Sequence, residues 1–321
     1  MLTPNHSHQP ALPSARGQLP LLILLPVIWA LHFAFIKKID AEEAVFTALA
    51  ALLGGISGLY FLALLVKRQL FAITLSQMRF FCIAGLFAYL LPLTAELLAA
   101  PHVDAGILTL IVALTPVFTV ALAIALRLVG ATKRLLLAVF VGLLGVLLLM
   151  LNYKPAGNSS IVWVMIACSV PLFYAIDALY VEHYWPQQLN ALQIAFGESL
   201  VAFLLILGIL MVSGTAPSEI SIWFAKPDFI ILCLITALEV FLFFYLVGRV
   251  GAVLVNIASY LVLPAGFFWG WIMFDEVLTP IGFACSIFAI AALLLAGNGG
   301  ERINSQPERQ HLGKISGGEK E

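Results

Sequence analysis

The sequence predicts an all-α integral membrane protein of ten transmembrane helices, arranged as two inverted-topology repeats of five. Three observations lead to this fold class. Of the 321 residues, 62% are hydrophobic and 10% are charged, which is more apolar surface than one soluble core of this length can bury. Apolar stretches of about 20 residues recur along residues 19–297. Two short sequence phrases also recur at a nearly constant offset.

The apolar stretches have the length that an α-helix needs to cross roughly 30 Å of hydrocarbon. We expect the helices at about residues 19–37, 45–66, 78–99, 104–126, 134–152, 161–181, 191–213, 228–247, 251–274 and 279–297. With the N-terminus in the cytoplasm, ten Lys and Arg residues flank the inner ends and four flank the outer ends. The positive-inside bias therefore predicts that both termini are cytoplasmic. The polar segments 1–18 and 298–321 are expected to be disordered tails.

The first recurring phrase is "PVIWALH", Pro26 to His32, and its second copy is "PLFYAID", Pro171 to Asp177, 145 positions later. The two copies fall in the first and the sixth expected helix. A copy that begins after five crossings enters the membrane from the opposite side, so the repeats are inverted. They would span residues 19–152 and 160–297.

A second pair of prolines supports the same repeat. Pro116 and Pro264 lie 148 positions apart, near the middle of the fourth and ninth expected helices. Proline removes a backbone donor, and broken helices at membrane depth persist where protein or water covers them. We therefore expect these two prolines, with Pro26 and Pro171, to flank a central pathway.

Ionisable residues inside apolar segments are the best functional candidates, because burying a charge in hydrocarbon is expensive. Glu239 lies near the middle of the eighth expected helix, and Glu198 lies about two turns into the seventh. We expect Glu239 to bind a proton or the amino group of a substrate in competition. Protonated packing acids are the alternative for both. Glu96 is placed near the outer end of the third helix, where its carboxylate would reach the interface.

His32 and Asp177 occupy matching places in the two repeats, but the inversion puts them in opposite halves of the membrane. We expect each to line its own vestibule, with Trp29 and Tyr174 one helical turn deeper. Satisfied interfacial groups are the alternative for the two ionisable residues, and ordinary packing is the alternative for the two aromatic ones.

Asn256 and Tyr260 lie four residues apart in "NIASYLVLP", which places them on one helix face close to Pro264. Polar groups that converge beside a broken helix are typical of a small-molecule site, so both are candidates for substrate binding. The glycines of the second and fifth expected helices are instead interpreted as close-packing faces. These are Gly54, Gly55, Gly58, Gly142 and Gly145.

Several stretches also resemble a known family. They are "LPVIWALHFAFIKK", "LTLIVALTPVFTVALAIAL", "FVGLLGVLLL" and "GRVGAVLVNIASYLVLPAGFFWGWIMFDEVLTP". This pattern resembles the EamA-like family of the drug/metabolite transporter superfamily over residues 19–297. The resemblance implies ten helices in two repeats. The sequence departs from the family pattern after the fourth expected helix. Family members often have an acidic turn there, and the second half of this chain keeps it as Asp275-Glu276, but the first half has Arg127 near that position.

The resemblance implies a secondary transporter that exports small organic metabolites, amino acids or related compounds, by alternating access across the bacterial inner membrane. The chain has no GxxxxGK[ST] motif, so the energy would come from a gradient of protons or of the substrate. Neither a metal nor a cofactor is expected, since the four cysteines show no ligand spacing, and the net charge of −1 does not favour nucleic acid. A membrane enzyme acting on lipid, a channel or scaffold, and a multidrug or cation efflux protein are the alternatives.

Overall fold

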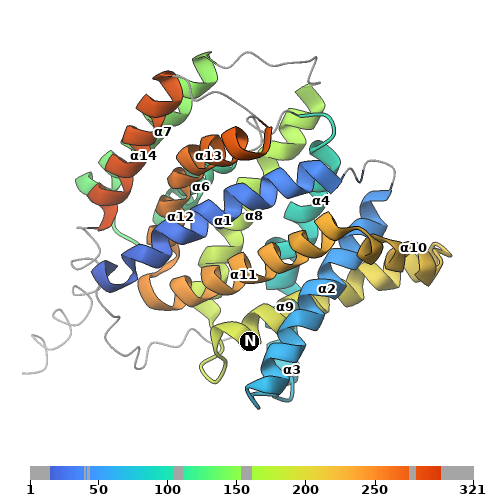
Figure 1. Ribbon diagram of the computed structural model, residues 1–321. Coiled ribbons are helices and arrows are strands. Elements are labelled where there is room, and N and C mark those ends of the chain that lie inside the picture. Colours follow the sequence, from blue (N-terminus) through green and yellow to red (C-terminus); the bar gives the residue numbers. More distant parts are fainter. Residues whose placement is uncertain are drawn as a thin grey trace, which may run out of the picture.

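The computed structural model describes residues 15–39, 41, 44–103, 111–152, 161–274 and 280–297, and all regular elements in these ranges are helices (Figure 1). Within them, seven helical segments are long and apolar enough to cross a membrane, and two shorter apolar helices accompany them. The expected tails before residue 15 and after residue 297 lie outside the described residues, as do Asp275 and Glu276. The chain is therefore a bundle of apolar helices.

The first half of the bundle contains seven elements after a short 3-10 turn, Ala15–Gln18. They are α1 (Leu19–Ile39), α2 (Val45–Val66), α3 (Leu75–Gly85), the π-helical segment η3 (Leu86–Leu90), α4 (Leu91–Ala99), α6 (Thr115–Ala125) and α7 (Lys133–Asn152). The third expected helix is thus one run of helix with a π-helical interruption. Thr74 begins it through a capping box, in which its backbone N–H donates to Gln77 Oε1 at 2.9 Å.

The second half contains nine elements. They are α8 (Ile161–Tyr184), α9 (Ala191–Val212), α10 (Pro217–Ser221), η4 (Ile222–Ala225), α11 (Pro227–Val250), α12 (Ala252–Ala258), η5 (Ser259–Leu261), α13 (Val262–Phe274) and α14 (Pro280–Gly297). Asn190 and Gln193 form the capping box that begins α9, with both hydrogen bonds at 3.0 Å. The boundary between α11 and α12 falls at Gly251, whose φ of +85° suits glycine.

The two deepest expected breaks are helix starts. Pro116 lies in the first turn of α6, directly after a turn at residues 113–114, and Pro264 lies in the first turn of α13, after η5. Proline is tolerated in a first turn because the N–H that it lacks has no intrahelical partner there. Pro26 and Pro171, in contrast, lie inside α1 and α8.

Close packing between helices depends on glycine. A Cβ atom on Gly142 of α7 would overlap the ring of Tyr260, and one on Gly145 would lie 2.9 Å from Phe288 Cβ. In α2, a Cβ on Gly54 or Gly55 would lie within 3.0 Å of Phe203 or Cys233. These four glycines form the expected close-packing faces. Gly58 does not, since nothing lies within 4 Å of its Cβ position.

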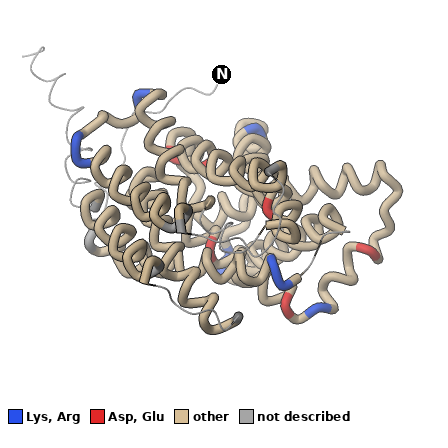
Figure 2. Tube along the Cα trace, turned by 90° about the horizontal axis from the view of Figure 1, so that it is seen from above, with Lys and Arg blue, Asp and Glu red and all other residues tan. Residues whose placement is uncertain are grey.

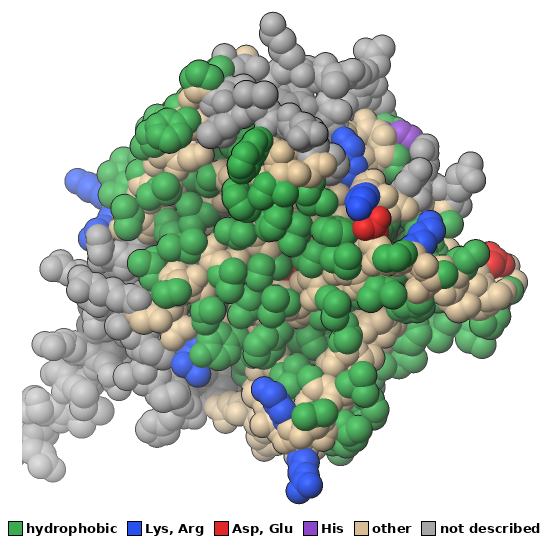
Figure 3. Space-filling view, in the orientation of Figure 1, with side chains coloured by type: hydrophobic (Ala, Val, Ile, Leu, Met, Phe, Trp, Pro, Cys, Tyr) green, Lys and Arg blue, Asp and Glu red, His purple; other side chains and the backbone are tan. Residues whose placement is uncertain are grey.

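The outside of the bundle is apolar. Figure 3 shows hydrophobic side chains over most of one face, with Lys and Arg toward its edges. Large apolar side chains point outward from several helices, among them Leu62 of α2 at 56% exposed and Trp271 of α13 at 60%. Lys38 and Asp228 pair at 2.8 Å where α1 ends and α11 begins. An apolar surface with charges at its margins is typical of a protein surrounded by lipid.

We predict that Gly142→Ala destabilises the bundle by about 1–3 kcal/mol, because the added methyl group overlaps the Tyr260 ring. Thermal unfolding of the purified protein in detergent measures the effect. The matched control is Gly58→Ala, which faces open space in a helix and should leave the unfolding temperature unchanged or raise it. Equal unfolding temperatures for Gly142→Ala and the wild type would contradict the predicted contact.

Candidate functional site

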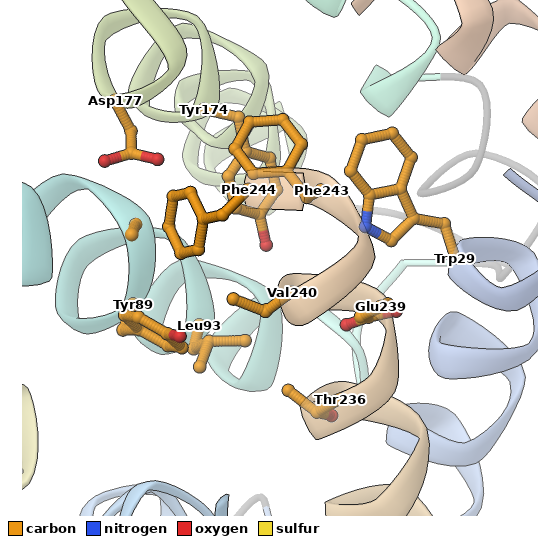
Figure 4. A pocket seen from close by; sticks show the side chains of 11 residues that line it. Trp29, Tyr89, Leu93, Tyr174, Asp177, Thr236, Glu239, Val240, Phe243 and Phe244 are labelled. Atoms are coloured by element: carbon orange, nitrogen blue, oxygen red, sulfur yellow. The ribbon is translucent and has the colours of Figure 1, made fainter. Parts of the chain in front are cut away.

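A cavity lies between α1, α8, α11 and the η3–α4 segment (Figure 4). Its empty volume is about 460 Å³, which includes open space at its mouth. The lining side chains are mostly aromatic or aliphatic, with two acids among them. They are Trp29, Ala88, Tyr89, Leu93, Tyr174, Asp177, Thr236, Glu239, Val240, Phe243 and Phe244.

A buried histidine links two acids at one side of this cavity. His32 Nδ1 lies 2.8 Å from Glu239 Oε1 and 3.0 Å from Thr236 Oγ1, and its Nε2 lies 3.4 Å from Glu96 Oε2. Tyr174 donates its hydroxyl hydrogen to Glu96 Oε1 at 2.8 Å. His32, Glu96 and Glu239 are each at most 3% exposed. The group therefore ties α1, α4, α8 and α11 together inside the apolar bundle.

Helical spacing explains how these side chains reach one another. Thr236, Glu239 and Phe243 follow each other at three and four residues, so they share one face of α11. Trp29 and His32 share a face of α1 in the same way. Figure 4 shows Trp29 and Glu239 on neighbouring walls of the cavity.

The electrostatics of the His32 group leave an acidic excess. A protonated imidazole carries one positive charge against the two carboxylates of Glu96 and Glu239. Buried charges need partners, since neither water nor bulk salt reaches them to compensate. Glu239 Oε2 has no hydrogen-bond partner among the described residues, so one carboxylate oxygen is left for a ligand beside the cavity.

The opposite side of the cavity is also acidic. Asp177 of α8 is 2% exposed and lines the cavity, and Figure 4 shows it across the aromatic side chains from Glu239. Glu198 of α9, which is not part of the cavity lining, is fully buried. Figure 2 shows acidic positions among the helices as well as at the ends of the bundle.

The structure revises two expectations about these residues. His32 and Asp177 were expected in separate vestibules. In the structure, His32 contacts Glu239, and Glu239 and Asp177 line the same cavity. From the sequence, a proton or the amino group of a substrate was the expected partner of Glu239, but in the fold His32 contacts this carboxylate. Residues far apart in the sequence meet because α1 packs along α11.

Asn256 and Tyr260 do not line the cavity. Asn256 donates to Thr119 Oγ1 at 2.7 Å, which joins α12 to α6, and Tyr260 donates to the backbone oxygen of Val139 at 3.1 Å on α7. Both residues lie on the broken segment between α11 and α13. Their contacts hold this segment in place, next to Glu182, which accepts a hydrogen bond from the N–H of Ala252 at the start of α12.

The sequence analysis missed part of the site. Glu96 was expected at the interface, but it is 2% exposed and contacts both His32 and Tyr174. A signal was present: Glu96 and Glu239 lie 143 positions apart, close to the offset of the repeat, in the third and eighth expected helices. Thr236 and the aromatic residues Tyr89, Phe243 and Phe244 were missed because ordinary apolar packing gives the same sequence pattern.

Comparisons with known proteins bear on the fold and the family. None of the curated proteins matches this chain. One solved structure, described as the crystal structure of a protein, is similar with a TM-score of 0.65 and 15% sequence identity, over 90% of this chain and 99% of the other. At this identity the likeness concerns the fold alone, and it extends over both halves of the bundle.

The model of the EamA-like transporter family matches residues 18–151, which coincide with the first expected repeat. Apolar helices suited to crossing a membrane occur in this part and continue in the second half. The chain is thus a multi-pass membrane protein whose residues 18–151 are similar to the EamA-like transporter family of the drug/metabolite transporter superfamily.

Proposed function

We propose that this protein is a secondary transporter that exports small organic metabolites, amino acids or related amines, across the bacterial inner membrane by alternating access. The observation that carries the proposal is the buried His32–Glu239 pair in the wall of an aromatic cavity between apolar helices. Ionisable groups at such places are costly and typically mark substrate or ion pathways. The match of residues 18–151 to the EamA-like transporter family supports transport as the activity.

We further propose that the chain crosses the membrane ten times, as repeats at 19–152 and 160–297. The pattern of helix contacts supports this. Among the ten expected helices, α1, α4 and α6 belong to the first, third and fourth, and α8, α11 and α13 belong to the sixth, eighth and ninth. Replacing each helix by the one five places away turns the contact of α1 with α11 into the contact of α8 with α4. It likewise turns the contact of α1 with α13 into the contact of α8 with α6. The pairs α2–α9 and α7–α14 map onto themselves. A two-fold axis in the membrane plane produces this pattern.

The cavity contacts link the two proposed repeats. His32 on α1 reaches Glu239 on α11, and Tyr174 on α8 reaches Glu96 on α4. Alternating access moves one repeat against the other, so these two contacts must change as the cavity opens to either side. A ligand that replaces one partner would shift the balance between the two arrangements.

The chemistry of the lining indicates an amine-bearing substrate with an apolar body. The free oxygen of Glu239 can accept a hydrogen bond from an ammonium group, and Trp29 and Phe243, whose ring centres lie 5.9 Å apart, offer ring faces to a cation or an apolar group. Apart from Asp177 and Thr236, the remaining lining is aliphatic or aromatic. Efflux of lipophilic cations uses the same contacts and is the second candidate.

We predict that Glu239→Gln weakens transport of amines by about 10- to 100-fold in apparent KM, because a charge-assisted hydrogen bond contributes about 1.5–3 kcal/mol. Counterflow in liposomes with phenethylamine, phenylalanine and leucine measures it. Glu219→Gln is the matched control, since Glu219 is an exposed acid on α10 far from the cavity lining. An unchanged apparent KM for all three compounds in Glu239→Gln would exclude this carboxylate from the site.

The proposed topology makes a second prediction. Reporter domains fused at Gly157, between the repeats, and at Gly313, in the C-terminal segment, should read outside and inside respectively, because five crossings separate the two halves. Paired alkaline phosphatase and green fluorescent protein fusions at each point measure this. The same side for both fusions would rule out the inverted repeat.

A further inference from the structure

Two acids that line the cavity each have a carboxylate oxygen without a hydrogen-bond partner. Glu239 on α11 is 3% exposed and Asp177 on α8 is 2% exposed, and both belong to the cavity lining. Among the described residues, neither Glu239 Oε2 nor Asp177 Oδ1 has a hydrogen-bond partner. Buried polar atoms normally have one, so each of these oxygens marks a place for a donor group of a ligand. The cavity therefore has two acceptor positions.

The two acceptor positions lie on different sides of the cavity. Figure 4 shows Asp177 at one end of the lining and Glu239 toward the other end. The aromatic side chains of Tyr174, Phe243 and Phe244 lie between them in this view. The two acids are carried by different helices, α8 and α11. An ammonium group that contacts one acid is therefore separated from the other acid by aromatic rings.

The ionised forms of the groups around the cavity leave two negative charges without a partner. A protonated His32 supplies one positive charge against the carboxylates of Glu96 and Glu239, which leaves one negative charge. Asp177 adds a second, and it takes part in none of the ion pairs found in the described part of the chain. The described residues of the lining include neither Lys nor Arg. Since buried charges need partners, a ligand with two positive charges matches this site.

The lining between the two acids suits an apolar spacer. The hydroxyl of Tyr174 donates to Glu96 at 2.8 Å, and the hydroxyl of Tyr89 donates to the backbone oxygen of Ala195 at 3.5 Å, so both are directed to protein groups. Most of the other side chains there are aliphatic or aromatic. A methylene chain is the slimmest apolar spacer that can pass along such rings. A carboxylate on the ligand, in contrast, would meet acids and no lysine or arginine in the described lining.

We propose that the preferred substrates of this cavity are α,ω-diamines, which are linear aliphatic chains with an ammonium group at each end and no carboxylate. One ammonium group donates a hydrogen bond to Glu239 Oε2 and the other donates to Asp177 Oδ1. The methylene chain lies along the aromatic side chains between them. This inference rests on the proposed function, whose substrate class it narrows, and it makes Asp177 a second substrate contact.

Two fixed contacts make binding depend on chain length and on both charged ends. A diamine that is too short reaches only one acid, so one chain length should bind best. That diamine should bind about 10- to 100-fold more tightly than the monoamine with the same number of carbons, because it makes a second charge-assisted hydrogen bond. Lysine and ornithine equal 1,5-diaminopentane and 1,4-diaminobutane with an added carboxylate. Each should bind more weakly than its diamine, because its carboxylate enters an acidic cavity.

Thermal unfolding of the purified full-length protein, titrated with each compound, measures these affinities, because a ligand of the native state raises the unfolding temperature. The compounds are the diamines from 1,3-diaminopropane to 1,8-diaminooctane, the monoamines of the same lengths, lysine and ornithine. A best chain length for the diamines, with the expected gap to the matching monoamine, supports the proposal. Equal affinities of diamine and monoamine at every length overturn it. So does a parallel gain with length in both series, which would indicate apolar burial alone.

Substitutions at Asp177 test the second contact directly. In Asp177→Asn the diamine and the matching monoamine should bind equally, whereas the exposed control Glu219→Gln should keep the preference of the wild type. Asp177→Glu keeps the charge and extends the side chain by one methylene group, so the best diamine should become shorter. A preference that survives in Asp177→Asn, or a best length that stays the same in Asp177→Glu, contradicts the contact. If neither variant folds, the length series of the wild type decides.

Counterflow in liposomes separates this inference from the proposed function. Wild-type counterflow of the best-binding diamine, with a lower apparent KM than that of the matching monoamine, supports both. Counterflow of phenethylamine without any preference for diamines leaves the proposed function standing and overturns the diamine site. Diamine binding with the expected length dependence but no counterflow of any amine contradicts the proposed transport and leaves the binding site. Neither binding nor counterflow of any amine overturns both.

Discussion

The compensation of buried charge is the constraint on which the centre of this bundle depends. His32 lies between Glu96 and Glu239 at 3.4 and 2.8 Å, in surroundings where an ion without a partner costs several kcal/mol. The three residues come from three different helices, so the requirement for pairing sets how α1, α4 and α11 lie relative to one another. The hydroxyls of Thr236 and Tyr174 complete the group and bring in α8.

Close packing around the centre then restricts what the cavity can do. A Cβ on Gly85 would lie 2.7 Å from the backbone oxygen of Glu198, and one on Gly197 would overlap the Phe81 ring. The α3–α9 contact therefore has little space for movement, and Glu198 is held on a rigid wall. In the second half, α12 begins after Gly251, and Glu182 accepts a hydrogen bond from the N–H of Ala252 in its first turn. The 3-10 segment η5 follows α12 directly. Asn256 and Tyr260 hold the broken segment against α6 and α7, so this side of the bundle is anchored by hydrogen bonds as well as by packing.

The helix positions were predictable from the sequence because hydrocarbon length and apolar composition determine them almost alone. Capping boxes at Thr74 and Asn190 even mark two helix starts. The partners of the buried groups were not predictable in the same way. Glu96 has the sequence context of an interfacial acid, and only the packing of α4 against α8 turns it inward. Asn256 and Tyr260 share a helix face, as their spacing indicates, but the sequence does not show that this face meets α6 and α7.

The matching positions of His32 and Asp177 have a consequence for how a molecule lies in the cavity. Two identical halves would present a bound molecule with the same chemistry at both ends. Here an acid paired with an imidazole stands at one side, and Asp177, which has no ion pair among the described residues, stands at the other. A solute with one polar end therefore has one preferred orientation, and mirror-image forms of a chiral solute place their substituents against different walls. Under the proposed function, this difference between the two walls predicts discrimination between enantiomers.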